Sequence, residues 1–195
     1  MKSTQKRVIL ASMSPRRTEL LSQAGIEHEI IPSSVIEGTN GRERPDEYVG
    51  RLAREKAMDV ARDNRDAVVI GSDTVVVLNG VILEKPTDRD EAKRMLGQLS
   101  GATHEVLTGV SVIGPERQDL FVTTTYVTFI DLPNEWLEGY LDSPEPYDKA
   151  GAYGIQGSGG LFVERLEGDY YNVVGLPIRP LVETLERHGV TPRFL

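Results

Sequence analysis

Hydroxyl and guanidinium groups gather in the stretch LASMSPRRTELL, residues 10–21, where an apolar strand is predicted to give way to a helix. Ser12 and Ser14 supply the hydroxyls, and Arg16 and Arg17 supply two adjacent cations. Amide groups at a helix N-terminus lack intrahelical acceptors and favour anions, and arginine pairs bidentately with phosphate. The spacing predicts a phosphate clamp. In the alternative interpretation, the Ser-Pro pair only caps the helix and the arginines are solvated.

The polar residues Ser72, Asp73 and Thr74 interrupt the apolar, β-rich segment AVVIGSDTVVVL, residues 67–78. A carboxylate left unpaired inside a sheet costs several kcal/mol, so we expect Asp73 to meet a metal ion, a cation or a cleft. Lys56 precedes this segment and Lys85 follows it, and each is a candidate contact for phosphate. The alternative is a bulge at a strand end, with Asp73 facing water.

Two loops carry further candidates. Glu37 lies in a polar, turn-rich stretch and is a candidate carboxylate for Mg²⁺, which prefers oxygen ligands. The glycine-rich segment DKAGAYGIQGSGG, residues 148–160, is predicted to fold closely around something. It contains Lys149 and Gln156, and a glutamine amide can recognise a base edge with its donor and acceptor. The alternative is a flexible surface loop.

Other residue types exclude several classes of site. Cysteine is absent, which excludes disulfides, thiolate metal sites and a cysteine nucleophile and fits a reducing cytosol. His28, His104 and His188 show neither metal-ligand nor triad spacing, so we assign them no chemistry. Trp136 is interpreted as a core or interface residue on a short amphipathic helix.

Composition places limits on the class of protein. Of 195 residues, 39% are apolar and 27% are charged, which suits one or two compact lobes with a sizeable core. The formal charge of −8 and the lack of a basic stripe argue against a nucleic-acid-binding protein. No apolar run approaches the about 20 residues that span a bilayer, and the N-terminal apolar stretch is too short for a signal peptide. We expect a cytoplasmic protein without membrane insertion.

The elements that must position these residues follow from the apolar pattern. Strands are predicted over residues 7–12, 27–33, 67–78, 81–86, 103–114, 119–131 and 161–168, and helices over residues 15–25, 45–64, 88–99, 133–141 and 177–188. The pair Asn79-Gly80 predicts a type I′ hairpin turn. The Ser14 hydroxyl is predicted to cap a helix, and Thr87 with Asp90 is predicted to form a capping box. Strands and helices alternate early in the chain, and consecutive strands follow later, which favours an α/β fold with a mixed sheet. We expect one domain of two lobes, whose boundary is not legible from the sequence.

Taken together and in order, the motifs resemble the Maf family of nucleoside triphosphate pyrophosphatases. The matching blocks span about residues 8–180 and are LASMSPRRTELL, YVGRLAREKA, GSDTVVVLNG, LEKP, HEVLTGV, DKAGAYGIQG and NVVGLP. The resemblance implies an elongated mixed sheet flanked by helices, with a cleft between two lobes, similar to the inosine triphosphate pyrophosphatases (Maf/Ham1 architecture). It also implies a homodimer, and hydrolysis of a nucleoside triphosphate to the monophosphate and pyrophosphate with Mg²⁺ or Mn²⁺.

The resemblance further implies a role for each candidate residue. Water attack on the α-phosphorus would depend on Asp73, Glu37, Lys56 and Lys85, and the metal would be held by Glu37 and Asp73. The substrate would be bound by Ser12, Ser14, Arg16, Arg17, Thr74, Lys149 and Gln156. The family often shows paired acidic residues where this chain has Ile36-Glu37, which leaves Glu37 as the sole match.

Substrate preference follows from three of these positions. Arg16, Thr74 and Gln156 match the branch that resembles dTTP/UTP pyrophosphatases. In the 7-methyl-GTP branch we expect an aromatic residue before the arginine pair, SDQ in place of SDT and a glutamate near GIQG. The alternatives are a 7-methyl-GTP pyrophosphatase, or a nucleotide-sensing inhibitor of septum formation that acts by binding. The full set of candidate residues argues against a pure binder, which has no need of water-activating carboxylates.

Overall fold

The computed structural model of the chain describes residues 6–38 and 43–193. Within these residues the strands form a seven-stranded sheet with the order β2-β1-β3-β5-β6-β7, in which β4 pairs with β3. The strands are β1 (Val8–Leu10), β2 (Glu29–Ile30), β3 (Val68–Leu78), β4 (Val81–Leu83), β5 (Thr103–Ile113), β6 (Gln118–Phe129) and β7 (Val163–Glu167).

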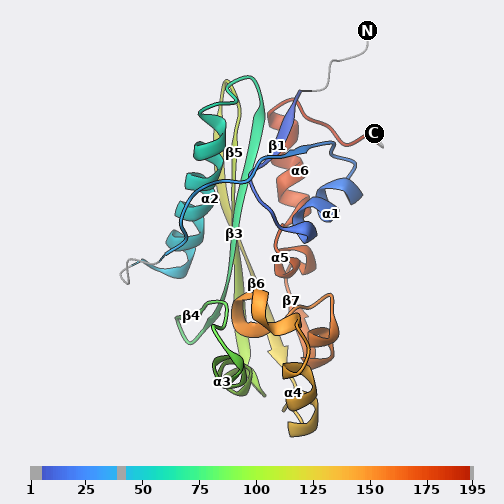
Figure 1. The fold of residues 1–195 in the computed structure, drawn as a ribbon. Coiled ribbons are helices and arrows are strands. Elements are labelled where there is room, and N and C mark those ends of the chain that lie inside the picture. Colours follow the sequence, from blue (N-terminus) through green and yellow to red (C-terminus); the bar gives the residue numbers. More distant parts are fainter. Residues whose placement is uncertain (1–5, 39–42, 194–195) are drawn as a thin grey trace. The chain divides into compact units, whose positions relative to one another are not determined.

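Helices flank this sheet (Figure 1). The α-helices are α1 (Pro15–Gln23), α2 (Pro45–Ala61), α3 (Arg89–Leu99), α4 (Asn134–Leu141), α5 (Tyr170–Val174) and α6 (Ile178–Arg187). Short 3-10 helices are η1 (Glu145–Asp148), η2 (Ala150–Ala152) and η3 (Ser158–Phe162).

Parallel and antiparallel pairs occur in the same sheet. β1 runs parallel to both β2 and β3, whereas β4 is antiparallel to β3 and β7 is antiparallel to β6. The hairpin between β3 and β4 turns at Asn79 (φ 50°) and Gly80 (φ 78°), as the Asn-Gly signal predicts. The predicted α/β fold with a mixed sheet flanked by helices is confirmed.

The chain divides into two compact units. The first comprises the chain up to Asp73, Thr108–Thr123 and the chain from Gly175 onward. The second comprises Thr74–Leu107 and Thr124–Val174. The long strands β3, β5 and β6 therefore each contribute residues to both units, and one boundary falls between two of the predicted site residues.

In the first unit, α2 lies on one side of the strands, and α1 and α6 lie on the other (Figure 1). Two glycines let the backbone of α2 approach the sheet closely. A Cβ atom at Gly71 would lie 2.2 Å from the carbonyl oxygen of Ala53, and one at Gly109 would lie 2.4 Å from that of Val49. Ala57 of α2 packs with Val69 of β3 in the small-residue core between helix and sheet.

The second unit has a core with an aromatic centre. His104 of β5 is buried, and its Nε2 atom lies 2.8 Å from the hydroxyl of Tyr153. Phe129 packs edge-on against both rings, at centroid distances of 4.9 and 4.7 Å. Burial lowers the pKa of His104 to about 4, so the imidazole is neutral at pH 7.

Two helix caps differ from their predictions. Within the described chain, the Ser14 hydroxyl makes no capping hydrogen bond to α1, although proline does occupy the first helical position. In α3 the cap is Asp88, whose carboxylate accepts from the amide of Glu91 at 2.8 Å. The Glu91 carboxylate in turn accepts from the amide of Thr87 at 2.8 Å. The helix cap is therefore Asp88 and not Thr87, and the predicted Thr87–Asp90 capping box is not formed.

Two short elements also differ. β2 covers only two of the predicted strand residues 27–33, and Pro32, which has no amide hydrogen, interrupts any further pairing. The five-residue helix α5 was not predicted, because it is too short to show a period. Its first turn is capped by the Asp169 carboxylate, which accepts from the amides of Tyr171 at 2.8 Å and Asn172 at 3.3 Å.

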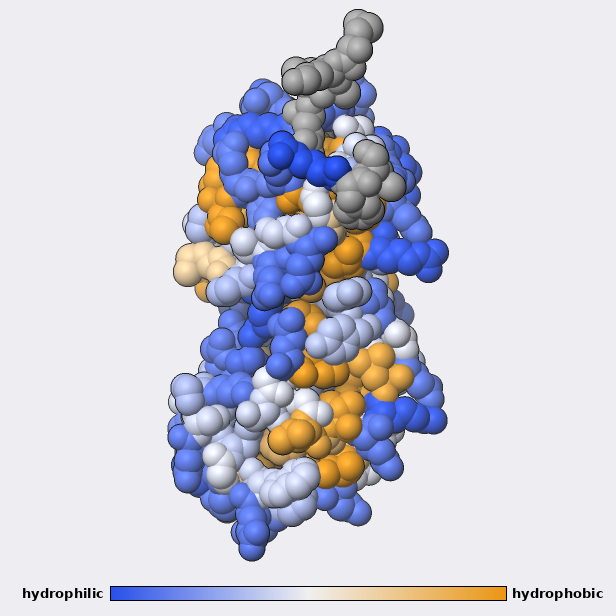
Figure 2. Space-filling model, turned by 90° about the vertical axis from the view of Figure 1, so that its right-hand side faces the viewer, coloured by the Kyte–Doolittle hydropathy of each residue, from blue (hydrophilic) through white to orange (hydrophobic). Residues whose placement is uncertain are grey.

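Hydrophilic residues predominate on the face drawn in Figure 2, with hydrophobic patches between them. Trp136 is 48% exposed, so the interpretation of this residue as part of the core is wrong. Among the helices of residues 6–38 and 43–193, none has the length and apolar composition required to cross a membrane.

We predict that Gly71→Ala destabilises the protein, because the new methyl group would overlap the backbone of α2. The expected loss in the free energy of unfolding is about 3 kcal/mol, measured by urea denaturation. Gly97→Ala is the matched control, since a Cβ atom on this exposed face of α3 meets nothing within 4 Å. That substitution should stabilise the helix by about 1 kcal/mol. Equal effects of the two substitutions would contradict the close approach of α2.

We predict that His104 makes stability depend on pH. Its folded-state pKa lies below that of the unfolded chain, so the unfolded state binds more protons and stability is lost as pH falls from 6.5 towards 4. Between pH 7.5 and 5 the wild type should lose about 2 kcal/mol more unfolding free energy than His104→Gln. Parallel pH profiles for the two proteins would show that the imidazole is not buried in its neutral form.

Candidate functional site

An ammonium group held by two carboxylates forms the centre of the site in the first unit. Lys56 donates from Nζ to Asp73 Oδ1 at 2.7 Å and to Glu37 Oε1 at 2.6 Å. The side chains of Lys56 and Asp73 are 9% and 10% exposed, whereas that of Glu37 is 49% exposed. Asp73 therefore meets a cation, as predicted, and the alternative of a water-facing residue in a bulge is wrong. β3 continues through this position without interruption.

The packing of α2 explains why Lys56 points at Asp73. Ala53 and Ala57 contact the backbone at Gly71, so the helix face that contains Lys56 lies directly against β3. Two residues beyond Gly71, the Asp73 side chain meets the lysine. Burying either charge alone would be unfavourable, and the ion pair offsets much of that penalty.

Burial also changes the proton affinity of the carboxylate. Removal from water raises the pKa of Asp73 above its ordinary value, while the charges of Lys56 and Arg17 oppose this rise and Glu37 adds to it. The result is a carboxylate that lies beside two cations and is more basic than an exposed aspartate. This combination is common at catalytic sites.

Arg17 joins the turn before α1 to the strand that holds Asp73. Its Nη1 atom donates to the Ser12 hydroxyl at 3.2 Å and to the Ser72 carbonyl at 3.0 Å, and its Nε atom donates to the Gly175 carbonyl at 2.8 Å. Burial lowers the pKa of Arg17 from its ordinary value, against the effects of Asp73 and Glu37. The guanidinium therefore fixes three chain segments in the first unit and adds positive charge beside Asp73.

The rest of the predicted clamp lies in the same turn. Ser14 is the N-cap residue of α1, and its hydroxyl is not used to cap the helix within the described chain. Arg16 follows in the first turn and is partly buried. With no acidic residue in that turn, the helix N-terminus keeps its positive field. The turn thus has the composition of an anion site, and its function as a phosphate clamp stays a prediction.

Four of the predicted site residues belong to the second unit. They are Thr74 on β3, Lys85 after β4, Lys149 before η2 and Gln156 before η3. Lys85 and Gln156 are exposed, and Thr74 is partly buried. Lys149 donates from Nζ to the Glu145 carbonyl at 2.7 Å and to the Asp148 carboxylate at 2.6 Å. The joint action of these residues with those of the first unit stays a prediction.

The predicted site for a divalent cation rests on two carboxylates, and it stays a prediction. In the part of the chain that the structure describes, no group of three or more histidines, aspartates and glutamates could hold a metal by itself. Glu37 and Asp73 nevertheless direct one carboxylate oxygen each at the same ammonium. Mg²⁺ is commonly held by one or two carboxylates, with waters and substrate phosphates completing its shell. This donor set suits such a cation.

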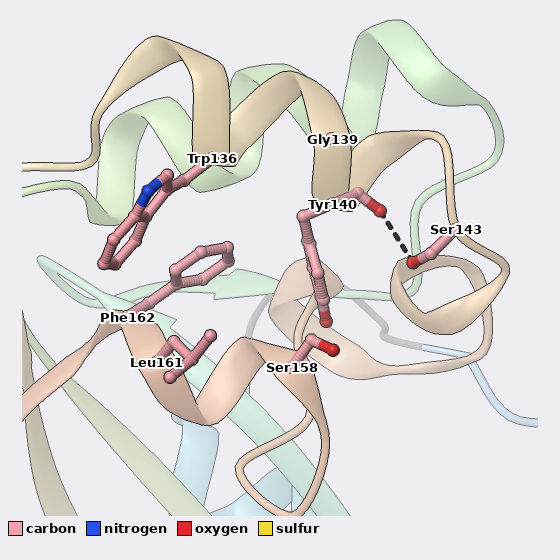
Figure 3. A pocket seen from close by; sticks show the side chains of 7 residues that line it. All are labelled: Trp136, Gly139, Tyr140, Ser143, Ser158, Leu161 and Phe162. Atoms are coloured by element: carbon pink, nitrogen blue, oxygen red, sulfur yellow. Dashed lines mark hydrogen bonds between the residues drawn. The ribbon is translucent and has the colours of Figure 1, made fainter.

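The second unit contains a pocket of about 270 Å³ (Figure 3). Its lining residues come from α4, the turn after it and η3, and they are Trp136, Gly139, Tyr140, Ser143, Ser158, Leu161 and Phe162. None of the residues that the sequence singles out for catalysis or substrate binding is among them.

Sequence reasoning missed two residues that build the site in the first unit. Ser72 is buried and accepts from Arg17 through its carbonyl, and Gly175 accepts from the same side chain with its own backbone at φ 123°. A left-handed φ favours glycine, so the Gly-Leu-Pro sequence before α6 is a usable signal for Gly175. Ser72 has no such signal, because its contribution is made by backbone.

Comparison with known proteins identifies relatives along nearly the whole chain. A family described as Maf-like protein matches residues 7–188. A dTTP/UTP pyrophosphatase of Exiguobacterium sibiricum is 52% identical over 191 residues, which are 98% of this chain and 97% of the relative. A dTTP/UTP pyrophosphatase of Bacillus pumilus is 50% identical over 185 residues, which are 95% of this chain and 98% of the relative. Among solved structures, the Staphylococcus aureus Ham1 protein gives a TM-score of 0.45 at 18% identity, over 65% of this chain and 73% of that one.

We predict that Lys56→Met is strongly destabilising at pH 7, because it leaves the Asp73 carboxylate buried without its cation. The expected loss is about 3 kcal/mol of unfolding free energy by urea denaturation. Lys93→Met is the matched control, since Lys93 forms an exposed ion pair with Glu138 and its loss should change stability by less than about 1 kcal/mol. If both substitutions had small effects, the ion pair in the first unit would not be buried.

Proposed function

The chain belongs to the Maf-like protein family, and on that premise we propose that it hydrolyses dTTP and UTP to the monophosphate and pyrophosphate. Support comes from relatives named dTTP/UTP pyrophosphatase that are about half identical over nearly the full length of both chains. The structural observation that carries the proposal is the buried Lys56 ammonium between Asp73 and Glu37. A pure binding module has no need of a buried carboxylate with a raised pKa.

Asp73 is the proton acceptor in the proposed reaction. Because burial raises the pKa of its carboxyl, it accepts a proton from water more readily than an exposed aspartate does. Lys56 stabilises the ionised form that is needed before the water reacts. The activated water attacks the α-phosphorus in line, and pyrophosphate leaves as the bond to the bridging oxygen breaks.

The turn before α1 binds the phosphates in this proposal. Ser12, Ser14 and Arg16 offer hydroxyl and guanidinium donors, and the amides at the start of α1 add their partial positive charge. Arg17 acts mainly by holding this turn against Ser72 and Gly175, and it contributes its charge. Lys56, and Lys85 from the second unit, add further positive charge towards the leaving pyrophosphate.

Glu37 and Asp73 are the residues that would hold a divalent cation, Mg²⁺ or Mn²⁺. When bound, such a cation neutralises phosphate charge and lowers the pKa of a coordinated water. Lys56 donates to one oxygen of each carboxylate and so keeps the two groups close together.

Recognition of the base is assigned to Thr74 and Gln156. Both side chains can donate and accept hydrogen bonds, which the polar edge of a pyrimidine requires. A site of this kind rejects a base that leaves its polar groups unpaired. Purine triphosphates are therefore expected to be poor substrates.

We predict pyrophosphate release from dTTP and UTP, but much less from CTP, GTP and 7-methyl-GTP, in a panel assayed with Mg²⁺ or Mn²⁺. Asp73→Asn should lower kcat on UTP by about 10²- to 10⁴-fold, because the amide cannot accept the proton. The folded structure should be retained, as measured by circular dichroism, since the amide still accepts from Lys56.

Asp63→Asn is the matched control, because Asp63 is exposed at the end of α2 and its loss should leave kcat unchanged. Near-normal turnover in Asp73→Asn would remove this residue from the mechanism. Equal efficiency on GTP and UTP would refute the pyrimidine preference. If no triphosphate released pyrophosphate, the enzyme proposal itself would fail and binding would become the better explanation.

A further inference from the structure

The carboxylate of Glu145 lies against the loop that contains Gln156. Its Oε2 atom accepts from the amide of Ser158 at 3.0 Å, and its Oε1 atom accepts from the amide of Gly159 at 3.1 Å. The hydroxyl of Tyr140 also donates to Oε1, at 3.1 Å. Both carboxylate oxygens are thus used, and they hold the loop immediately after Gln156.

The glycines of this loop are explained by the same contacts. A Cβ atom at Gly157 would lie 2.3 Å from Oε1 and 2.5 Å from Cδ of Glu145. One at Gly159 would lie 2.8 Å from the hydroxyl oxygen of Tyr140. The object around which the glycine-rich segment folds closely is therefore in part the protein's own Glu145, with Tyr140 beside it.

The loop is also held on the other side of Gln156. The amide of Gly154 donates to the Tyr140 hydroxyl at 3.3 Å, so one phenol contacts both the loop and the Glu145 carboxylate. Figure 3 shows the Tyr140 side chain extending from α4 towards the segment that contains Ser158. Burial, reinforced by Glu145, raises the pKa of Tyr140, so the phenol stays protonated and remains a donor.

The side chain of Gln156 is exposed. The residues two before and two after it, Gly154 and Ser158, are fixed through Tyr140 and Glu145. Because the backbone is fixed on both sides of Gln156, little conformational freedom is lost when a ligand binds. The side-chain amide is also presented in a defined direction.

We propose that Glu145 is a positioning residue for base recognition, which fixes the loop of residues 154–159 so that the Gln156 amide can distinguish uracil and thymine from other bases. The inference rests on the proposed function and adds a residue to it. Glu145 touches no reacting atom. It acts through the amides of Ser158 and Gly159, and a carboxylate is required because both oxygens must accept.

The test compares kcat/KM for UTP and CTP in the wild type and in Glu145→Gln. The glutamine keeps the size of the side chain but retains only one acceptor oxygen, so one contact with the loop is lost. We expect the ratio of kcat/KM for UTP to that for CTP to fall about tenfold. A role in stability alone would lower both values in proportion and leave the ratio unchanged.

Glu138→Gln provides the matched control. Glu138 of α4 is also a glutamate, but its carboxylate pairs with Arg89 and Lys93 on the surface and not with the loop. This variant should keep the wild-type ratio. If Glu145→Gln does not fold, Tyr140→Phe tests the same connection, because it removes one donor to Glu145 and the acceptor of the Gly154 amide. A smaller fall in the ratio is then expected.

A double variant separates positioning from an independent effect. If Glu145 acts through Gln156, then Glu145→Gln combined with Gln156→Ala should lower the ratio no further than Gln156→Ala alone. Additive losses, or an unchanged ratio in Glu145→Gln with an active wild type, would overturn the inference and leave the proposed function intact. A wild type that releases no pyrophosphate from UTP would overturn both.

Discussion

The close approach of α2 to β3 at Gly71 is the constraint on which the first unit depends. Because the helix backbone rests on the strand, the Lys56 side chain on this face of α2 is almost completely buried. The ammonium therefore needs anionic partners, and the buried Asp73 and the half-exposed Glu37 provide them. The charge arrangement that we assign to catalysis is thus a direct consequence of how small residues pack between a helix and a sheet.

Local sequence signals were sufficient for the long elements and insufficient for the short ones. The runs that became β3, β5 and α2 are long enough to show their period, whereas the two residues of β2 and the five of α5 are not. The pairing of Lys56 with Asp73 joins residues 17 apart on different elements. Spacing could predict that Asp73 needs a cation, but the choice of Lys56 depends on the rotation of α2 about its axis, which Gly71 sets in three dimensions.

Arginine has a different function in the turn before α1 from the one that its sequence context suggests. Adjacent cations in a first helical turn predict an anion, and Arg16 is consistent with that interpretation. Arg17, in contrast, donates to the backbone of Ser72 and Gly175 and so orders the site from within. A sequence shows which donors are present, but backbone carbonyls are available everywhere along the chain, so it does not reveal which donors they will engage.

Gly157 lacks room for a side chain because the Glu145 carboxylate fills the space where a Cβ atom would stand. A side chain at position 157 would therefore displace the carboxylate from the amides of Ser158 and Gly159. A shorter residue at position 145 would leave room at position 157, but it would give up the same two contacts. The small size of residue 157 is thus a condition for the carboxylate to reach the loop, rather than for the loop to bend.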